Sequence, residues 1–188
     1  MNNIQGVGIN DLKGKINVSD FKSYDIWKGI LRRCYSKEQN KDKSYKNIKV
    51  CEEWLLYSNF KKWYDKNFPS ELEKNWKLQI DKDLLSRKNK IYSPQTCIFL
   101  PKKINTFLSN QQNSNTSGVV GVSYIKSSNS WRARIRNFDN HDRIYLGCYS
   151  DKNTAGEVYI KARMKQAEKA KDILRKLNYP ENIIELIK

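Results

Sequence analysis

A row of arginines is the part of this sequence with the clearest chemistry. The segment from Trp131 to Arg136 reads W-R-A-R-I-R. Side chains of a β-strand alternate between two faces, so this segment places Arg132, Arg134 and Arg136 on one face and three apolar residues on the other. Like charges about 7 Å apart on one sheet face repel each other and stabilise a fold poorly. A guanidinium instead binds phosphates and guanine edges through two parallel hydrogen bonds, so the row predicts a nucleic-acid ligand.

The charge of the whole chain agrees with this prediction. The 188 residues include 36 Lys and Arg against 20 Asp and Glu, which gives a formal net charge of +16 at pH 7. Such a charge attracts polyanions, so a nucleic acid is the leading candidate partner. An anionic membrane surface is a second candidate, and a general enrichment in Lys, Asn, Ile and Tyr without functional meaning is a third explanation. The compositional explanation does not account for arginines that alternate with apolar residues.

No segment of the sequence predicts a transmembrane helix. The first residues, M-N-N-I-Q-G-V-G-I-N-D-L-K, contain neither a basic region nor a continuous apolar run. We therefore predict no secretory signal, no membrane association and a cytoplasmic location. The cysteines are widely spaced and stand beside aromatic or aliphatic residues: Cys34, Cys51, Cys97 and Cys148. This spacing favours free, buried thiols over zinc ligands or disulfides.

A change in composition predicts two domains. Residues Ser109 to Gly118 read S-N-Q-Q-N-S-N-T-S-G and contain no charge and no large apolar side chain, which is typical of a linker. We therefore expect a module at residues 1–108, a linker at 109–118 and a second module at 119–188. The elements expected in the first module are helices at 21–35 and from Glu52 to before Pro69, strands at 76–80, 91–92 and 97–100, a polar turn at 81–90, and a short helix at 102–108.

The second module is expected to contain three strands followed by one long helix. The strands are predicted at 119–124, 131–136 and 143–149, and the helix at 151–177, with a further helical turn at 181–187. In the third strand, strict alternation places Ile144, Leu146 and Cys148 on one face, and Arg143, Tyr145 and Gly147 on the other. One helix across the apolar face of such a sheet leaves the arginine side open to a ligand.

The second module resembles a known DNA-binding domain. The runs S-G-V-V-G-V-S-Y, S-W-R-A-R-I-R, R-I-Y-L-G-C-Y-S-D and T-A-G-E-V-Y, between Ser117 and Ala170, are similar to the APETALA2 or ethylene-response-factor type. The resemblance implies a three-stranded sheet that lies in the DNA major groove. This chain has Val120, Ser123 and Ile125 where relatives place arginines, which moves the expected contacts toward the later strands. The resulting DNA-contact residues are Ser123, Lys126, Arg132, Arg134, Arg136, Arg143 and Tyr145.

The first module resembles proteins of phages and mobile elements that are related to HNH homing endonucleases. The resemblance is carried by Y-x-x-W-x-x-x-L-x-R-C-Y from Tyr24, by V-C-E-E-W, by I-D-K-D and by Y-S-P-Q-T-C-I-F-L-P-K-K-I-N. It implies a ββα-metal module that holds one divalent cation, Mg²⁺ or Mn²⁺, at Asp81 and Asn105. The position of the catalytic histidine is occupied by Lys82.

Lys82 changes the chemistry that this resemblance implies. A protonated lysine cannot take a proton from water at neutral pH, although as a cation it can stabilise a phosphorane. Asp83 is then the candidate base or second carboxylate ligand, since an extended D-x-D segment places both carboxylates on one side. The alternative is that Asp81 and Asp83 are ordinary turn acids that open a polar loop, with Asn105 on a helix surface.

These patterns together predict an α+β protein that binds double-stranded DNA. The fold would combine an HNH-like, ββα-metal-like module, in intact or degenerate form, with a C-terminal three-stranded antiparallel sheet packed on one long helix. One functional hypothesis is a phage-type homing or nicking endonuclease with a non-standard site, acting in the host cell. The alternative is a non-catalytic DNA-binding regulator or counter-defence protein with a decayed nuclease fold. A third hypothesis is capture of RNA or a nucleoprotein by the basic surface.

Overall fold

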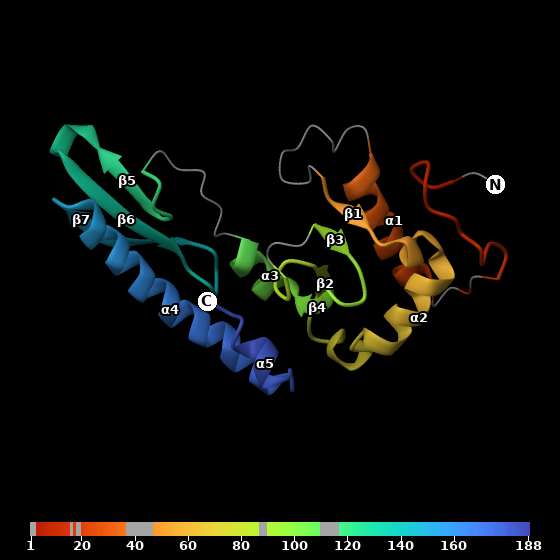
Figure 1. Ribbon diagram of the computed structural model, residues 1–188. Coiled ribbons are helices and arrows are strands. Elements are labelled where there is room, and N and C mark those ends of the chain that lie inside the picture. Colours follow the sequence, from red (N-terminus) through yellow and green to blue (C-terminus); the bar gives the residue numbers. More distant parts are fainter. Residues whose placement is uncertain (1–2, 16, 18–19, 37–46, 87–89, 110–116) are drawn as a thin grey trace. The chain divides into compact units, whose positions relative to one another are not determined.

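The chain forms two compact units (Figure 1). The computed structural model describes all residues except 1–2, 16, 18–19, 37–46, 87–89 and 110–116. The first unit is Met1–Leu100 and the second unit is Pro101–Lys188. Both combine helices with strands, which confirms the predicted α+β fold class.

An aromatic core holds the first unit together. Helix α1 spans Phe21–Tyr35 and helix α2 spans Tyr57–Asn67. Trp27 of α1 is fully buried; its ring centroid lies 5.3 Å from that of Tyr57, and its Nε1 donates a hydrogen bond to the Trp54 carbonyl oxygen at 2.6 Å. Each aromatic side chain buries about 150–250 Å², so this cluster is the main apolar contribution to the stability of the unit.

Two small sheets complete the first unit. Strand β1 (Lys49–Val50) pairs in parallel with β3 (Ile91–Tyr92), and β2 (Leu78–Asp81) pairs with β4 (Ile98–Pro101). A short 3-10 helix, η5 (Ser70–Leu72), lies between α2 and β2. The side chains of β2 alternate between buried and half-buried, and this pattern leaves Asp81 half-buried at the end of the strand.

The helix expected from Glu52 is interrupted. Glu52–Leu55 forms a 3-10 helix, η4, and α2 begins only at Tyr57. Between them Leu56 is extended and forms a parallel bridge with Ile9, whose carbonyl oxygen accepts a hydrogen bond from the Tyr57 N–H at 3.0 Å. The prediction of one continuous helix is wrong here, because a distant segment supplies hydrogen-bond partners that helical periodicity does not report.

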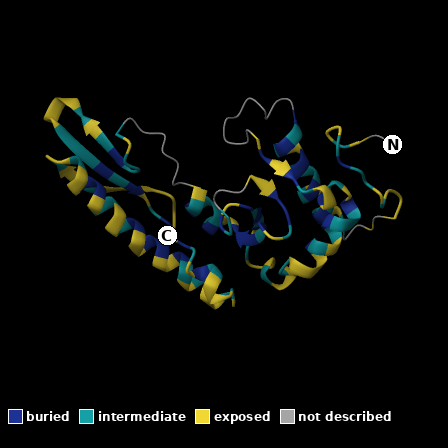
Figure 2. Ribbon diagram, viewed as in Figure 1, coloured by how far each residue is buried: buried dark blue, intermediate teal, exposed yellow. Residues whose placement is uncertain are grey.

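The second unit is a three-stranded antiparallel sheet covered by a long helix, as predicted (Figure 1). Its elements are β5 (Val122–Ile125), the 3-10 helix η6 (Lys126–Ser128), β6 (Ser130–Arg136), β7 (Arg143–Tyr149), α4 (Lys152–Lys176) and α5 (Glu181–Ile184). Strand β6 lies in the middle of the sheet. Figure 2 shows exposed residues recurring along the outer side of α4.

Small residues allow α4 to pack closely on the sheet. Ala133 of β6 and Ala155 of α4 are fully buried, next to the buried Val122 of β5. The helix begins at a cap, in which the Asp151 carboxylate accepts a hydrogen bond from the Thr154 N–H at 2.7 Å. The helix therefore covers the apolar face of the sheet, and the opposite face is the one that a ligand can meet.

Helix α3 (Lys102–Ser109) belongs to the second unit. Its Phe107 ring meets the Phe138 ring edge-on, with centroids 5.4 Å apart. Arg163 of α4 donates from Nη2 to the Phe107 carbonyl oxygen at 3.1 Å, and its guanidinium carbon lies 3.3 Å from the centroid of that ring.

The boundary between the units differs from the one that composition indicates. The units divide between Leu100 and Pro101, ahead of the helix that was expected in the N-terminal module. Most of the expected linker, residues 110–116, lies outside the described residues. A polar composition marks a connecting segment, but it carries no information about the unit on which the preceding helix packs.

Candidate nucleic-acid interface

The central strand of the second unit decides which side chains share a face. Directly opposed residues of antiparallel strands project to the same side of a sheet. Opposite the three arginines of β6 lie Ser123 of β5 and three residues of β7. These side chains form a surface that we call the arginine face: Ser123, Arg132, Arg134, Arg136, Arg143, Tyr145 and Cys148.

A β-bulge in β7 changes which of its side chains reach the arginine face. The register of β6 and β7 shifts between Ala133 and Arg134, which are opposite Gly147 and Tyr145 respectively. Leu146 is therefore the extra residue of the bulge. The strict alternation expected for this strand is wrong after this residue, because Gly147 and Cys148 exchange the faces that the sequence predicts.

Cys148 and Gly147 show the consequences of the bulge. Cys148 lies on the arginine face and is exposed, so the expectation that every cysteine is buried is wrong at this position. Cys34 and Cys97 are buried, and burial raises the pKa of the Cys97 thiol to about 12. Gly147 has a φ of 126°, and a Cβ there would lie 2.7 Å from the Tyr149 hydroxyl oxygen, so the bulge requires glycine.

Neighbouring acids do not neutralise the arginine face. Within the described part of the chain, no ion pair involves Arg132, Arg134, Arg136 or Arg143. Burial lowers the pKa of Arg134, and the charges of Arg132 and Arg143 lower it further. The Arg132 Nε and the Ser123 hydroxyl are buried without a hydrogen-bond partner among the described residues. Concentrated positive charge with unused donors suits an anionic ligand.

Two other expected contact residues border the arginines. Tyr145 is 60% exposed and lies opposite Arg134, so its ring offers a flat surface beside the guanidinium groups. A hydrogen bond with Cys148 raises the pKa of Tyr145. Lys126 is exposed in η6, in the turn between β5 and β6. The structure thus brings every expected DNA-contact residue to the arginine face or to the turn beside it.

A cavity of about 350 Å³ lies next to the arginine face. Its walls come from β5, β6, β7, α3, α4 and the loop between β6 and β7. The lining residues that bear on function are Phe107, Arg134, Arg136, His141, Arg143 and Tyr159.

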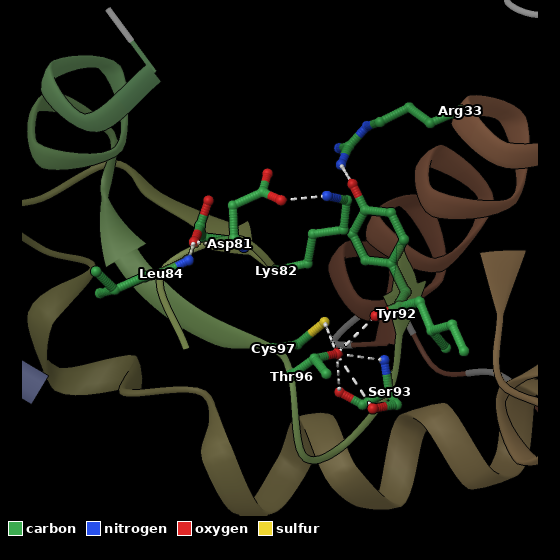
Figure 3. A network of polar contacts seen from close by, with 10 residues as sticks. Arg33, Asp81, Lys82, Leu84, Tyr92, Ser93, Thr96 and Cys97 are labelled. Carbon is green, nitrogen blue, oxygen red and sulfur yellow. Dashed lines mark hydrogen bonds and ion pairs between the residues drawn. The ribbon is translucent and has the colours of Figure 1, made fainter. Parts of the chain in front are cut away.

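Asp81, the residue matched to a metal ligand, closes a turn in the first unit (Figure 3). Its Oδ1 accepts hydrogen bonds from the backbone N–H groups of Asp83 at 3.0 Å and Leu84 at 2.7 Å. Burial raises the pKa of Asp81; the Leu84 N–H opposes this effect, and the charge of Asp83 adds to it. A carboxylate that accepts two nearby backbone N–H groups stabilises a turn.

Lys82 and Asp83 pair with each other in the same turn. Lys82 is buried, and its Nζ forms an ion pair with the Asp83 carboxylate (Figure 3). The same Nζ lies 5.9 Å from the ring centroid of Tyr92, whose hydroxyl accepts a hydrogen bond from Arg33 at 3.1 Å. The chain bends at Lys82, so the extended D-x-D segment considered from the sequence does not form.

These contacts fit a divalent cation poorly. Mg²⁺ requires near-octahedral oxygen ligands. The Oδ1 of Asp81 already accepts two backbone N–H groups, and the Asp83 carboxylate is paired with an ammonium. Asn105, the second expected ligand, lies half-buried on α3. Among the described residues, no three His, Cys, Asp or Glu side chains come together to hold a metal ion.

Periodicity alone does not identify some neighbours of the arginine face. Cys148 reaches it only because of the bulge, for which the glycine inside the predicted strand is the one available signal. Phe107 and His141 reach the cavity through the docking of α3 and the path of the β6–β7 loop. Both depend on tertiary packing between segments far apart in the sequence.

Comparisons with known proteins leave the family open. The chain matches no family model, no curated protein and no solved structure. None of the helices in the described ranges is long and apolar enough to cross a membrane. The geometry of the arginine face is therefore the main basis for a functional proposal.

Proposed function

We propose that this protein binds double-stranded DNA through the arginine face of its second unit. The observation that carries the proposal is the register of the sheet, which gathers four arginines and Tyr145 on one side. Among the described residues these arginines have no acidic partner. The other side of the sheet packs on α4.

The spacing of the arginines suits a DNA duplex. Residues i and i+2 of a strand are about 7 Å apart, which is close to two base-pair steps of about 3.4 Å each. Arg134 and Arg136 can therefore meet base pairs two steps apart, and a guanidinium binds O6 and N7 of guanine as a bidentate fork. The major groove, about 12 Å wide, admits β-strands. The resemblance to ethylene-response-factor domains supports the same docking mode.

The residues beside the arginines have complementary roles in this proposal. Tyr145 presents an exposed ring that can contact a thymine methyl group, and Lys126 extends from the neighbouring turn toward the phosphate backbone. Base-edge contacts give sequence preference, whereas the lysine adds affinity that depends on salt.

For the first unit, the contacts of Asp81 support the non-catalytic alternative over the nicking endonuclease. In that alternative, the protein is a DNA-binding regulator or a counter-defence protein. Asp81 and Asp83 have partners that stabilise a turn, and the proposed DNA binding does not use them.

A gel-shift titration of the full-length protein tests the proposal. The expected result is that Arg134→Ala weakens binding to a duplex of about 20 base pairs by about 1–3 kcal/mol, which is roughly 5- to 150-fold. Arg32→Ala, which removes the same charge from an exposed position on α1, is the matched control and stays near the wild-type affinity. Equal affinities of Arg134→Ala and wild type across several salt concentrations would contradict the proposal.

A further inference from the structure

The cavity beside the arginine face has a positively charged wall. Arg134, Arg136 and Arg143 line it from two neighbouring strands, and His141 lines it from the β6–β7 loop. The described lining residues include no carboxylate. The His141 backbone N–H donates to the Asn137 carbonyl oxygen at 2.9 Å, which holds the histidine at the cavity. Guanidinium groups bind phosphate oxygens in pairs, so the charge of this wall suits a phosphate group.

Aromatic rings form the rest of the wall. Phe107 and Phe138 both line the cavity and meet edge-on. The Tyr159 ring occupies the space that a Cβ at Gly121 would need, and Gly121 has a φ of 74°, so glycine at this position keeps the ring in place. Nucleobases stack on aromatic side chains, and every base has a face that can stack.

The size of the cavity limits the ligand. Ligand sites enclose about 300–1,000 Å³, and about 350 Å³ lies at the lower end of that range. The space suits one phosphate-bearing planar ring and is too small for a stacked oligonucleotide.

We propose that this cavity holds a single nucleotide that lies outside a base stack. Its phosphate faces Arg134, Arg136 and Arg143, and its base lies against the aromatic wall. The inference rests on the proposed function, because the same arginines belong to the arginine face. The nucleotide has two possible sources: a nucleotide of the bound duplex that turns out of the helix, or a free nucleoside monophosphate.

A pair of duplexes tests the first source. One is fully paired, and the other has the same sequence with one unpaired adenosine, whose base leaves the stack at lower cost. The full-length protein is expected to bind the bulged duplex about tenfold more tightly. Val120 also lines the cavity. Val120→Trp fills this space without changing its charge, so it removes the preference while affinity for the paired duplex stays within about threefold. Ile160→Trp, at an exposed position of α4 outside the cavity lining, is the matched control and keeps the preference.

A mononucleotide tests the second source. Deoxyadenosine monophosphate is titrated into the full-length protein by calorimetry, with deoxyadenosine, which lacks the phosphate, as the control. The inference is supported if the monophosphate binds, deoxyadenosine does not, and Val120→Trp weakens the binding. If the two duplexes also bind equally, the cavity is assigned to a free nucleotide. If Val120→Trp does not fold, Val120→Phe replaces it as a smaller filler.

The inference and the proposed function fail in different ways. Duplex binding without a bulge preference, together with no binding of the monophosphate, overturns the inference and leaves the proposed function in place. Loss of all duplex binding contradicts the proposed function, and the monophosphate titration then decides whether the cavity binds a nucleotide.

Discussion

The arginine face of the second unit and the Asp81 turn of the first unit both contain several charged side chains. The charges of the turn have partners within the protein, whereas those of the arginine face have no acidic partner in the part of the chain that the structure describes. In the turn, Asp81 accepts two backbone N–H groups and Lys82 pairs with Asp83. On the arginine face, like charges stand opposite each other, as Arg136 and Arg143 do. Charges that satisfy one another contribute to folding, whereas opposed like charges cost stability until an anion arrives.

This difference supports the proposal that the arginine face binds a ligand and that the Asp81 turn stabilises the fold. Proteins depart from stable local arrangements mainly at functional sites. The arginine face is such a departure, because three arginines of β6 share a side with Arg143. The Asp81 turn is not, because its groups are paired. Variants of the arginine face should therefore lower DNA affinity, whereas variants of the Asp81 turn should change the free energy of unfolding.

The largest expected effect comes from reversing one charge of the arginine face. In Arg143→Glu, a carboxylate stands opposite Arg136, so the free energy of unfolding is expected to rise by about 0.2–1 kcal/mol. DNA affinity is expected to fall by about 3 kcal/mol or more, over a hundredfold, because a contact is lost and a repulsive charge is added. Urea unfolding and fluorescence anisotropy measure the two changes. Arg32→Glu on α1 is the control for net charge. A loss of both stability and affinity would contradict the claim that the arginines of this face serve binding rather than folding.

In the Asp81 turn, the effect is expected on stability. Asp81→Ala removes the acceptor of two backbone N–H groups, so the free energy of unfolding is expected to fall by about 1–2 kcal/mol. Asp81→Asn keeps an oxygen acceptor without the buried charge and is expected to be at least as stable as wild type. Both variants should bind DNA with wild-type affinity. If wild type nicks plasmid DNA in Mg²⁺ and Asp81→Asn does not, Asp81 is a catalytic residue and its assignment as a turn acid is wrong.

The raised pKa of Asp81 predicts that the difference in stability between wild type and Asp81→Asn depends on pH. The folded-state pKa lies above the ordinary value of 3.8, so between these two values the native state holds more protons than the unfolded state. The contribution of Asp81 to the free energy of unfolding therefore falls as pH rises through this window. Relative to wild type, Asp81→Asn should gain stability as pH rises from below 3.8, and the difference should then level off. A difference that does not depend on pH would contradict the raised pKa.

The smallest expected effect concerns Lys126. Lys126→Ala removes one phosphate contact, so binding to every DNA sequence should weaken by under about 1 kcal/mol, and the slope of log K against log salt should decrease by about 1. Lys74→Ala, at an exposed position of the first unit, is the control and should leave the slope unchanged. An effect restricted to one DNA sequence would instead place Lys126 at a base edge.

Much of the fold follows from sequence periodicity, because most elements are local. The spacing of aromatic residues predicts α1 with its observed ends, Phe21 and Tyr35. The alternation W-R-A-R-I-R predicts the face of each arginine in β6, since this strand keeps its pleat. Both results depend only on residues that are close in sequence.

The remaining features depend on contacts that a local pattern does not contain. Ile9 interrupts a helix through a bridge to Leu56, and the bulge at Leu146 moves Cys148 to the arginine face. The resemblance places Asp81 at a metal site, but its observed contacts are with backbone N–H groups two and three residues later. Sequence similarity at four residues does not determine how the following loop bends.

Site-directed cross-linking at Cys148 tests most directly whether the arginine face lies in the major groove. Cys148 is exposed on that face, whereas Cys34 and Cys97 are buried and Cys51 is half-buried. A duplex that carries a disulfide-activated thiol tether on a major-groove base edge is expected to form an adduct with the full-length protein through thiol–disulfide exchange. Cys148→Ser should abolish the adduct, and a minor-groove tether should not form it. An adduct that survives Cys148→Ser, or that forms equally well from the minor groove, would contradict binding through the arginine face.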